Sequence, residues 1–329
     1  MITPKLTLNQ CMNNHNLTFH GKGSTYFGIV AINFILTALT LGLYYPWAKA
    51  KYRNYLWNET EFQNSRFVFH GTGREMFKGF LIAYVVFVIF YVLYFMIFSN
   101  PNLAGPLAVI GFITFMIFVV FLFTPFAIFS SWRYRVSRTS WRGIYFSFSA
   151  SFSEYYKLYI KYLLLTIVTF GIAFPWLRVS IQQYLIGHTR LGSLKLDFHG
   201  EGGTLFGINL LGYILLYPTL FLYVPFFLKN RFNFTINNTT LSDDKVRRSL
   251  VSHLQGWDFF GVLIVNLILL VFTFGLAFPF TKMRAMKAMY DTIELPNDID
   301  YDDIIQNADA YNQATGEEML DLLDIDIDF

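Results

Sequence analysis

The sequence predicts an all-α polytopic membrane protein with about six transmembrane or re-entrant segments in two repeated halves, and short β-strands beside the membrane. Three observations support this fold class. First, 54% of the 329 residues are hydrophobic and only 14% are charged, whereas a soluble domain carries about 25% charged residues. Second, the chain contains long apolar runs. Third, two short phrases recur along it at matching spacings.

The apolar runs set the number of segments. They cover residues 27–47, 77–98, 107–129, 162–176, 205–228 and 259–280. Most approach the ~20 residues that a helix needs to cross the hydrocarbon core. The polar start of the chain is unlike a removable signal peptide, so the first run is expected to act as the membrane signal.

A closing phrase, T-x-G-x3-P, ends three of these runs, as "TLGLYYPW", "TFGIAFPW" and "TFGLAFPF". Proline cannot donate to the carbonyl four residues earlier, and here that residue is glycine, so the phrase predicts a broken or bent helix. The predicted helix-break residues are Thr40, Gly42, Pro46, Trp47, Thr169, Gly171, Pro175, Trp176, Thr273, Gly275, Pro279 and Phe280. Either the helix stops at the interface, or it is discontinuous and lines a solute site, with Asn33 and Asn266 as candidate lining residues.

A second phrase is a short strand pattern that ends in Phe, then His or Ser, with an aromatic residue eight positions after the Phe. Its copies start at Phe19, Phe69, Phe148 and Phe198. The first and third copies, like the second and fourth, are 129 residues apart. This offset predicts two membrane halves, 19–145 and 146–290, between a polar segment, 1–18, and an acidic, largely disordered tail, 291–329.

Together these phrases, with the basic stretch that follows the first, resemble the YjgN-like family of bacterial inner-membrane proteins. The resemblance covers about residues 19–295. It implies a multi-pass protein of the bacterial inner membrane and supplies no catalytic residues. Phe280, where the other copies have Trp, departs from the pattern and leaves a specific tryptophan role there in doubt.

Charge is distributed unevenly along the chain. Residues 1–290 hold all 25 Lys and Arg against 9 acids, while residues 291–329 hold 13 acids. Basic clusters beside apolar runs favour membrane lipids as partners and leave no extended face for nucleic acid. The candidate lipid-headgroup residues are Arg133, Arg135, Arg138, Arg142, Arg247 and Arg248. The acidic tail is a candidate for docking on these basic loops or on a partner.

Two topologies fit the charge pattern. Six crossings put successive closing phrases on opposite sides of the membrane, as in inverted three-plus-three repeats of transporters. If every closing phrase instead lies on one side, several runs enter the membrane and return. The fourth run favours this second arrangement, because Lys157 and Lys161 shorten it.

No catalytic, metal or cofactor site is predicted, and the chain is not expected to be an enzyme. His20, His70, His199 and His253 each stand alone in the second phrase, unlike the closely spaced ligands of zinc sites. They are interpreted as strand-end residues. The single cysteine, Cys11, permits no internal disulfide.

Two functions remain open from the sequence. The first is a transporter or channel-like carrier of a small solute, prompted by the broken helices and the inverted topology. The alternative is a non-catalytic membrane scaffold or lipid-binding protein, prompted by the basic interfaces and the absence of acids from the middles of the runs. The oligomeric state is left open.

Overall fold

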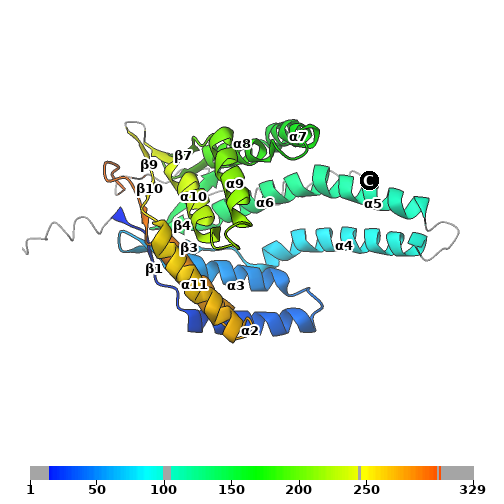
Figure 1. Ribbon diagram of the computed structural model, residues 1–329, viewed down its shortest axis with the longest axis horizontal. Coiled ribbons are helices and arrows are strands. Elements are labelled where there is room, and N and C mark those ends of the chain that lie inside the picture. Colours follow the sequence, from blue (N-terminus) through cyan, green and yellow to red (C-terminus); the bar gives the residue numbers. More distant parts are fainter. Residues whose placement is uncertain (1–14, 99–104, 244–245, 302–303, 305–329) are drawn as a thin grey trace, which may run out of the picture.

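The computed structural model describes residues 15–98, 105–243, 246–301 and 304. Five helical hairpins alternate with short strands along the chain (Figure 1). The helices are α2 Gly23–Leu39, α3 Tyr45–Asn58, α4 Gly73–Phe98, α5 Pro106–Phe118, the π-helix η2 Val119–Phe123, α6 Thr124–Ser137, α7 Phe152–Val168, α8 Phe174–Gly187, α9 Gly202–Leu216, α10 Val224–Asn237, α11 Gly256–Phe272 and α12 Phe278–Tyr290. We call each hairpin, with the strands that follow it, a unit.

The prediction of an all-α fold is wrong, because the strands form an extended antiparallel sheet. They are β1 Thr18–Phe19, β2 Thr60–Phe62, β3 Ser65–Phe69, β4 Thr139–Trp141, β5 Ile144–Phe148, β6 Thr189–Leu191, β7 Leu194–Phe198, β8 Thr239–Ser242, β9 Arg247–Ser249, β10 Val251–Ser252 and β11 Ile293–Glu294. Strands β1 to β9 pair in chain order, and β10 pairs with β11. The sequence indicated short strands, but it did not show that strands of successive units pair with one another.

The sheet closes on itself. The Leu17 amide donates to the carbonyl of Ile293 (2.9 Å), and the Leu295 amide donates to that of His15 (2.8 Å). Residues 15–17 lead directly into β1, and β9 leads through Leu250 into β10. Strand pairing, together with the continuous chain at these two joints, therefore runs around a circle among the described residues, which we call the β-ring. Closure leaves no long unpaired edge exposed for association with other chains.

Helices follow the same circular order as the strands. Each second helix of a hairpin contacts the first helix of the next unit, and α12 of the last unit contacts α2 of the first. Every hairpin leaves the β-ring and returns to it, so all the interhelical turns lie at the ends remote from the sheet. Figure 1 shows the α2–α3, α4–α5 and α7–α8 hairpins extending away from the strands.

This arrangement corrects the predicted fold class of about six membrane segments, whereas the boundaries of the two halves, 19–145 and 146–290, stay a prediction. The structure has five successive units, and four of the six apolar runs each contain the turn of a short hairpin. The run 27–47, for example, covers α2 and the start of α3. A polypeptide that reverses within the run cannot cross the bilayer in it. Reversal of the chain within these four runs fits re-entrant segments better than the inverted three-plus-three arrangement, and the membrane topology stays a prediction.

One hairpin is longer than the others. In the part of the chain that the structure describes, the two helices long and apolar enough to cross a membrane are Gly73–Met96 and Val109–Ser137. At 1.5 Å per residue, the 26 residues of α4 extend roughly 39 Å, against a hydrocarbon core of ~30 Å. The 17 residues of α2 extend roughly 25 Å before the chain turns back.

Each unit has a proline early in its second helix, and the structure around that proline differs between the long hairpin and the short ones. Pro46, Pro175, Pro225 and Pro279 each stand in the first turn of a second helix, immediately after a turn. Pro125 stands equally early in α6, but there η2 precedes it and the helix continues. The Thr124 hydroxyl donates to the carbonyl of Val119 (2.7 Å). Wider π geometry accommodates the missing donor without ending the helix.

The β-ring has its own hydrophobic core. Phe62, Trp141, Leu191, Leu194 and Leu241 come from four different strand pairs and cluster together. Side chains from strands around a ring can form one cluster only if they point into its interior. These five side chains lie near the turns that connect paired strands, at the end of the β-ring remote from the helices. Each strand pair follows one helix and leads into the next, so its turn is at the end farthest from both helices.

The acidic segment that follows α12 contributes to this core. Ile299, Tyr301 and Ile304 are buried within the same cluster. The residues from Asp291 to Tyr301 are therefore placed on the body of the protein, and β11 is part of the β-ring. The expectation of disorder for residues 305–329 falls outside the described residues.

Candidate functional site

The closing phrase forms the tight turn of each short hairpin. At the end of α2, the Thr40 hydroxyl donates to the carbonyl of Leu36 (2.7 Å) and accepts a hydrogen bond from the Tyr44 amide (3.0 Å). The Gly42 amide donates to the carbonyl of Thr37 (2.8 Å), the long bond of a Schellman cap. Gly42 has φ +92°, which explains why glycine occupies this position.

Equivalent turns occur in three other units. The long bonds are Gly171 to Thr166 (2.7 Å), Phe221 to Leu216 (2.8 Å) and Gly275 to Leu270 (2.8 Å). The turn at Thr219 was missed in the sequence because Phe221, at φ 66°, replaces the glycine. The sequence feature that could have revealed this turn is the regular interval of 50 residues between successive prolines, Pro125, Pro175 and Pro225.

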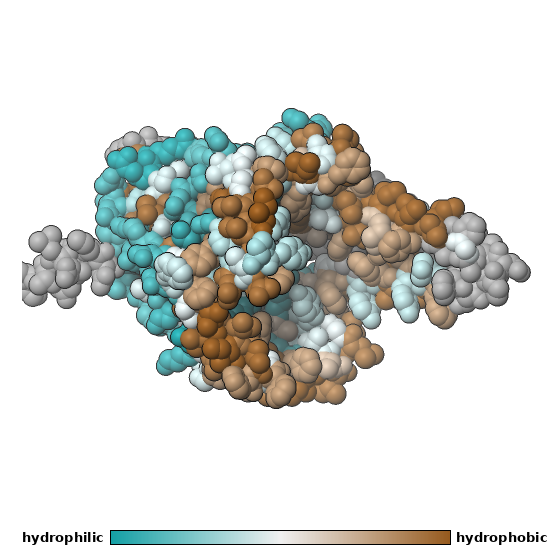
Figure 2. Space-filling view, viewed as in Figure 1, coloured by the Kyte–Doolittle hydropathy of each residue, from teal (hydrophilic) through white to brown (hydrophobic). Residues whose placement is uncertain are grey.

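The tip of each turn presents an apolar side chain to the surroundings. Leu41, Phe170, Leu220 and Phe274 all have positive φ and are 81–97% exposed. A left-handed conformation is strained for such residues, and an apolar side chain gains nothing from exposure to water. Figure 2 shows hydrophobic surface over the hairpins and hydrophilic surface over the sheet end. The four tips therefore lie at the apolar end of the molecule.

The two repeated phrases meet between consecutive units. The aromatic residue after the proline packs against the glycine at or near the start of the next unit's first helix, where a Cβ would overlap its ring; this glycine is the second of an F-H-G-x-G phrase at Gly23, Gly73 and Gly202, and ends the sequence S-H-L-Q-G at Gly256. The pairs are Trp47 with Gly73, Trp176 with Gly202, Phe226 with Gly256 and Phe280 with Gly23. At the remaining junction, Phe126 and Phe152 are in ring contact, with centroids 6.1 Å apart. These residues are therefore part of the interface between units.

Asn33 and Asn266 are buried within their own hairpins. The Asn33 side-chain amide donates to the carbonyl of Ala48 (3.4 Å), and that of Asn266 donates to the carbonyl of Thr281 (3.1 Å). Each therefore ties a first helix to its second helix. Their side-chain oxygens, like that of Asn209, lack a hydrogen-bond partner in the structure. Lining of a solute site by Asn33 and Asn266 stays a prediction.

The six candidate headgroup arginines do not converge. Arg138 is buried and pairs with Glu75 (3.2 Å), Arg247 pairs with Asp197 (2.9 Å), and Arg248 pairs with Asp298 (2.8 Å). The remaining three are placed as follows. Arg142 bonds to Ser65 and stacks over Trp141, Arg135 lies over Trp132, and Arg133 is half-buried on α6. A role for these arginines in lipid binding stays a prediction.

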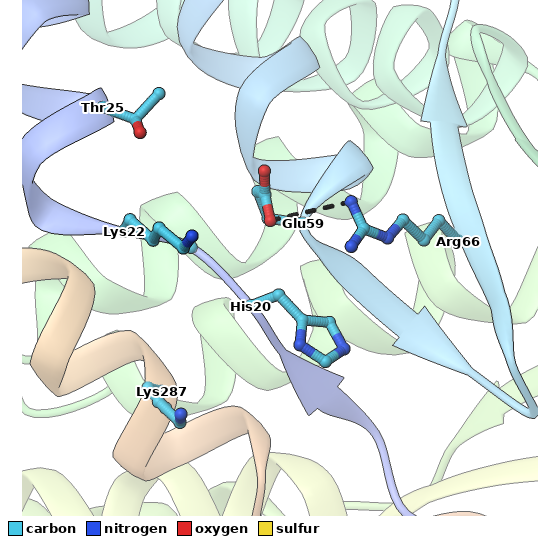
Figure 3. Close-up of a pocket in the computed structure, with 7 residues that line it drawn as sticks. His20, Lys22, Thr25, Glu59, Arg66 and Lys287 are labelled. Carbon is cyan, nitrogen blue, oxygen red and sulfur yellow. Dashed lines mark ion pairs between the residues drawn. The ribbon is translucent and has the colours of Figure 1, made fainter.

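A pocket of about 600 Å³ lies where the first and last units meet (Figure 3). We call it the seam pocket. It is lined by His20, Gly21, Lys22, Thr25, Glu59, Arg66 and Lys287. These residues come from the end of β1, the start of α2, the end of α3, β3 and α12. Sequence reasoning missed this site, because Lys22 and Lys287 are distant along the chain and are brought together only by closure of the ring.

The seam pocket carries an excess of positive charge. Arg66 is shared between Glu59 (3.8 Å) and Glu61 (3.7 Å), and His20 also contacts Glu61 (3.1 Å). Lys22 and Lys287 form no ion pair within the described residues. Lys22 also caps α2, where no side chain satisfies the first amides. Two lysines and a helix N-terminus favour an anion.

A tyrosine cluster supports the pocket from below. The Tyr55 hydroxyl accepts a hydrogen bond from the Lys22 amide (2.7 Å) and donates to the Lys22 carbonyl (2.9 Å). Tyr55 stacks on Tyr26, and Lys282 of α12 lies 4.1 Å from the ring centroid of Tyr52. This cluster fixes the backbone of the pocket at Lys22, and Lys282 is held over the tyrosine rings.

The strand-end histidines bind neighbouring residues rather than one another. His70 bonds through Nε2 to the Ser140 hydroxyl (2.8 Å), and His253 pairs with Glu294 (2.7 Å). Desolvation of the ring, and after it the charge of Arg138, lower the pKa of His70. The described residues contain no group of three or more His, Cys, Asp or Glu side chains able to hold a metal ion.

Comparison with known proteins places the chain in a family. The model of a family described as bacterial protein of unknown function (DUF898) matches residues 14–228 and 208–322. The chain belongs to this family. Within it, the inner membrane protein YjgN of Salmonella typhimurium is 24% identical over 87% of this chain and 90% of its own length. The YjgN protein of Escherichia coli O157:H7 is 32% identical over 42% of the chain and 32% of its own length.

The predicted resemblance to YjgN-like proteins is thus confirmed, and this DUF898 protein is a bacterial inner-membrane protein. No solved structure matches the chain.

Proposed function

We propose that this inner-membrane protein binds anionic lipid headgroups at the seam pocket. The observation that carries the proposal is the pair of lysines, Lys22 and Lys287, that face one pocket without a carboxylate partner. The pocket lies at the start of α2, between the hydrophilic β-ring and the apolar helices. A phosphate group with two acyl chains has the matching combination of charge and apolar surface.

The energetics favour a phosphate-bearing lipid. A basic residue near an anionic membrane surface contributes ~1 kcal/mol, so the two lysines together account for roughly 30-fold in affinity. Three further donors are available, from the first-turn amides of α2, the Thr25 hydroxyl and His20. Phe27, Phe280 and other exposed apolar residues of α2 and α12 provide a surface for the acyl chains.

The test uses the full-length protein in phosphatidylcholine nanodiscs that contain a minor fraction of phosphatidylglycerol. Native mass spectrometry counts the phosphatidylglycerol retained. We expect enrichment by the wild type and roughly tenfold or greater loss of affinity in K22Q/K287Q. The matched control is K195Q, an exposed lysine on β7 outside the pocket. Equal retention by K22Q/K287Q and K195Q would contradict the proposal.

A carrier of a small solute is the second candidate. The side-chain oxygens of Asn33, Asn209 and Asn266, buried without partners, favour it, since unpaired polar atoms in a membrane region need a ligand or water. Swelling of proteoliposomes in a panel of small neutral and anionic solutes tests it. A carrier gives swelling that N33L/N266L abolishes. Absence of swelling with every solute would contradict transport and leave lipid binding untouched.

A further inference from the structure

The interior of the β-ring is occupied by the chain's own acidic segment. Tyr301 contacts Phe62 and Trp141 edge-on, with ring centroids 5.0 Å and 6.3 Å apart, and Ile299 and Ile304 are buried beside it. We call this apolar interior, formed by Phe62, Trp141, Leu191, Leu194 and Leu241, the ring basin. Without the segment, these five side chains would present one contiguous apolar surface.

The segment is held by side chains rather than by the backbone. The last backbone hydrogen bond to the β-ring among the described residues is that of the Leu295 amide to His15. Beyond it, the Tyr301 hydroxyl donates to Pro296 of its own segment (3.0 Å). Asp298 pairs with Arg248 (2.8 Å), and both of these side chains are more than half exposed.

The β-ring closes without this segment. Its hydrogen bonds at Leu17, Ile293 and Leu295 all precede the buried isoleucine and tyrosine residues. Removal of residues 298–304 therefore breaks no strand pairing. An element held by a few apolar contacts and an exposed ion pair opens more readily than the fold around it.

The rim of the basin matches an acidic ligand. Arg248 stands directly opposite Leu241 of the basin in the register of β8 and β9, so its side chain leaves the sheet on the same face as the basin residues. Arg248 already pairs with an aspartate of the segment. An acidic chain with apolar residues at alternate positions suits such a site, because it places its charges at the rim and its apolar side chains in the basin.

The sequence contains that pattern twice. Residues 298–302 read D-I-D-Y-D, and residues 324–328 read D-I-D-I-D, followed by Phe329. We propose that the ring basin is a docking site for acidic segments of this pattern, and that residues 324–329 compete with residues 298–304 for it. Both segments would fit the ring basin in the same way, because each has apolar residues at the second and fourth positions of the five-residue pattern and acids at the first, third and fifth.

The full-length chain provides the test as a double-mutant cycle on thermal stability in detergent. I325S/I327S is expected to leave Tm unchanged in the wild type, where residues 298–304 fill the basin. In the I299S/Y301S background, the same change is expected to lower Tm by several degrees, because the distal segment has become the occupant. A synthetic peptide of residues 322–329 is expected to restore that Tm, whereas the peptide with both isoleucines replaced by serine is not.

The proposal fails if I325S/I327S has the same effect on Tm in both backgrounds and if the peptide raises Tm in neither. Should I299S/Y301S not fold, the same cycle is read in R248Q. That variant removes the exposed ion pair to Asp298 and a long hydrogen bond to the Arg247 carbonyl (3.4 Å). In R248Q, we expect I325S/I327S to lower Tm by a smaller amount than in I299S/Y301S. If Tm in R248Q does not change on replacement of residues 325 and 327, the proposal is overturned.

Discussion

Trp47 of the first unit packs its ring onto Gly73, the residue at which α4 of the second unit begins. Trp47 also contacts Phe77, one turn further along α4, with ring centroids 4.9 Å apart. Both partners belong to phrases that recur along the chain. The conserved spacing between the phrases therefore records a contact between neighbouring units, in which an aromatic ring fills the space left by a missing side chain.

Replacement of Gly73 or Gly202 by alanine should destabilise the protein. The new Cβ would overlap the ring of Trp47 or Trp176, and overpacking of this kind costs about 1–3 kcal/mol. Thermal unfolding in detergent measures it. The control is G79A in α4, where nothing lies within 4 Å of the added Cβ. An equal Tm for G73A and G79A would show that the contact between the ring and the glycine is unimportant.

Charge at a hairpin tip should impair membrane insertion. Phe170 is 97% exposed at a turn that we place in lipid, and an aspartate deep in the bilayer costs about 3 kcal/mol relative to an apolar residue. We expect F170D to reduce the membrane-integrated fraction after carbonate extraction, and F170L to retain it. If F170D integrates as well as F170L, the tip lies in water.

Cysteine labelling should place the second helices on one side of the membrane. In a variant without Cys11, cysteines replace Lys51 in the middle of α3 and Arg178 in the second turn of α8, both of which are exposed. We expect an impermeant thiol reagent to label both from the cytoplasm, the side to which basic residues are retained. A cysteine at Gly105, beside the tip of the long hairpin, should be labelled from the opposite side. Labelling of positions 51 and 178 from opposite sides would exclude the ring.

Protonation of His70 should lower stability. Its pKa is lower in the folded protein than the ordinary value of 6.5, so the unfolded chain binds the proton more readily. The contribution of the neutral ring to stability is complete above pH 6.5 and is lost as the pH falls through that value toward the folded pKa. Unfolding by guanidinium between pH 7.5 and pH 5 should show a steeper loss for the wild type than for H70Q. Identical pH dependence in the two proteins would contradict this assignment.

Several features could be predicted from residues alone. The apolar runs and the uneven charge gave the membrane location, because composition is sufficient to distinguish lipid-facing from water-facing chains. The T-x-G-x3-P phrase gave a helix break, because proline and a left-handed glycine act locally. Strand ends at Phe19, Phe69, Phe148 and Phe198 were predicted from alternation and are present in the structure.

Other features depend on contacts between distant residues. Whether Pro46 ends a membrane crossing or begins a returning helix depends on how α3 packs against α4, and the run of apolar residues is the same in both cases. The turn at Thr219 was not predicted, because Phe221 stands where the other three turns have glycine. Lys22 and Lys287 line one pocket only because α12 packs on α2.

The sequence by itself determined three of the helix breaks, the apolar character of the runs and the residues at which four strands end, because each of these depends on a few neighbouring residues. Only the tertiary structure decided that the strands of five units pair in a circle, that the short hairpins return to it, and that Tyr301 fills its interior. These features depend on hydrogen bonds and packing between units, which are specified by shape and register across the whole chain rather than by local pattern.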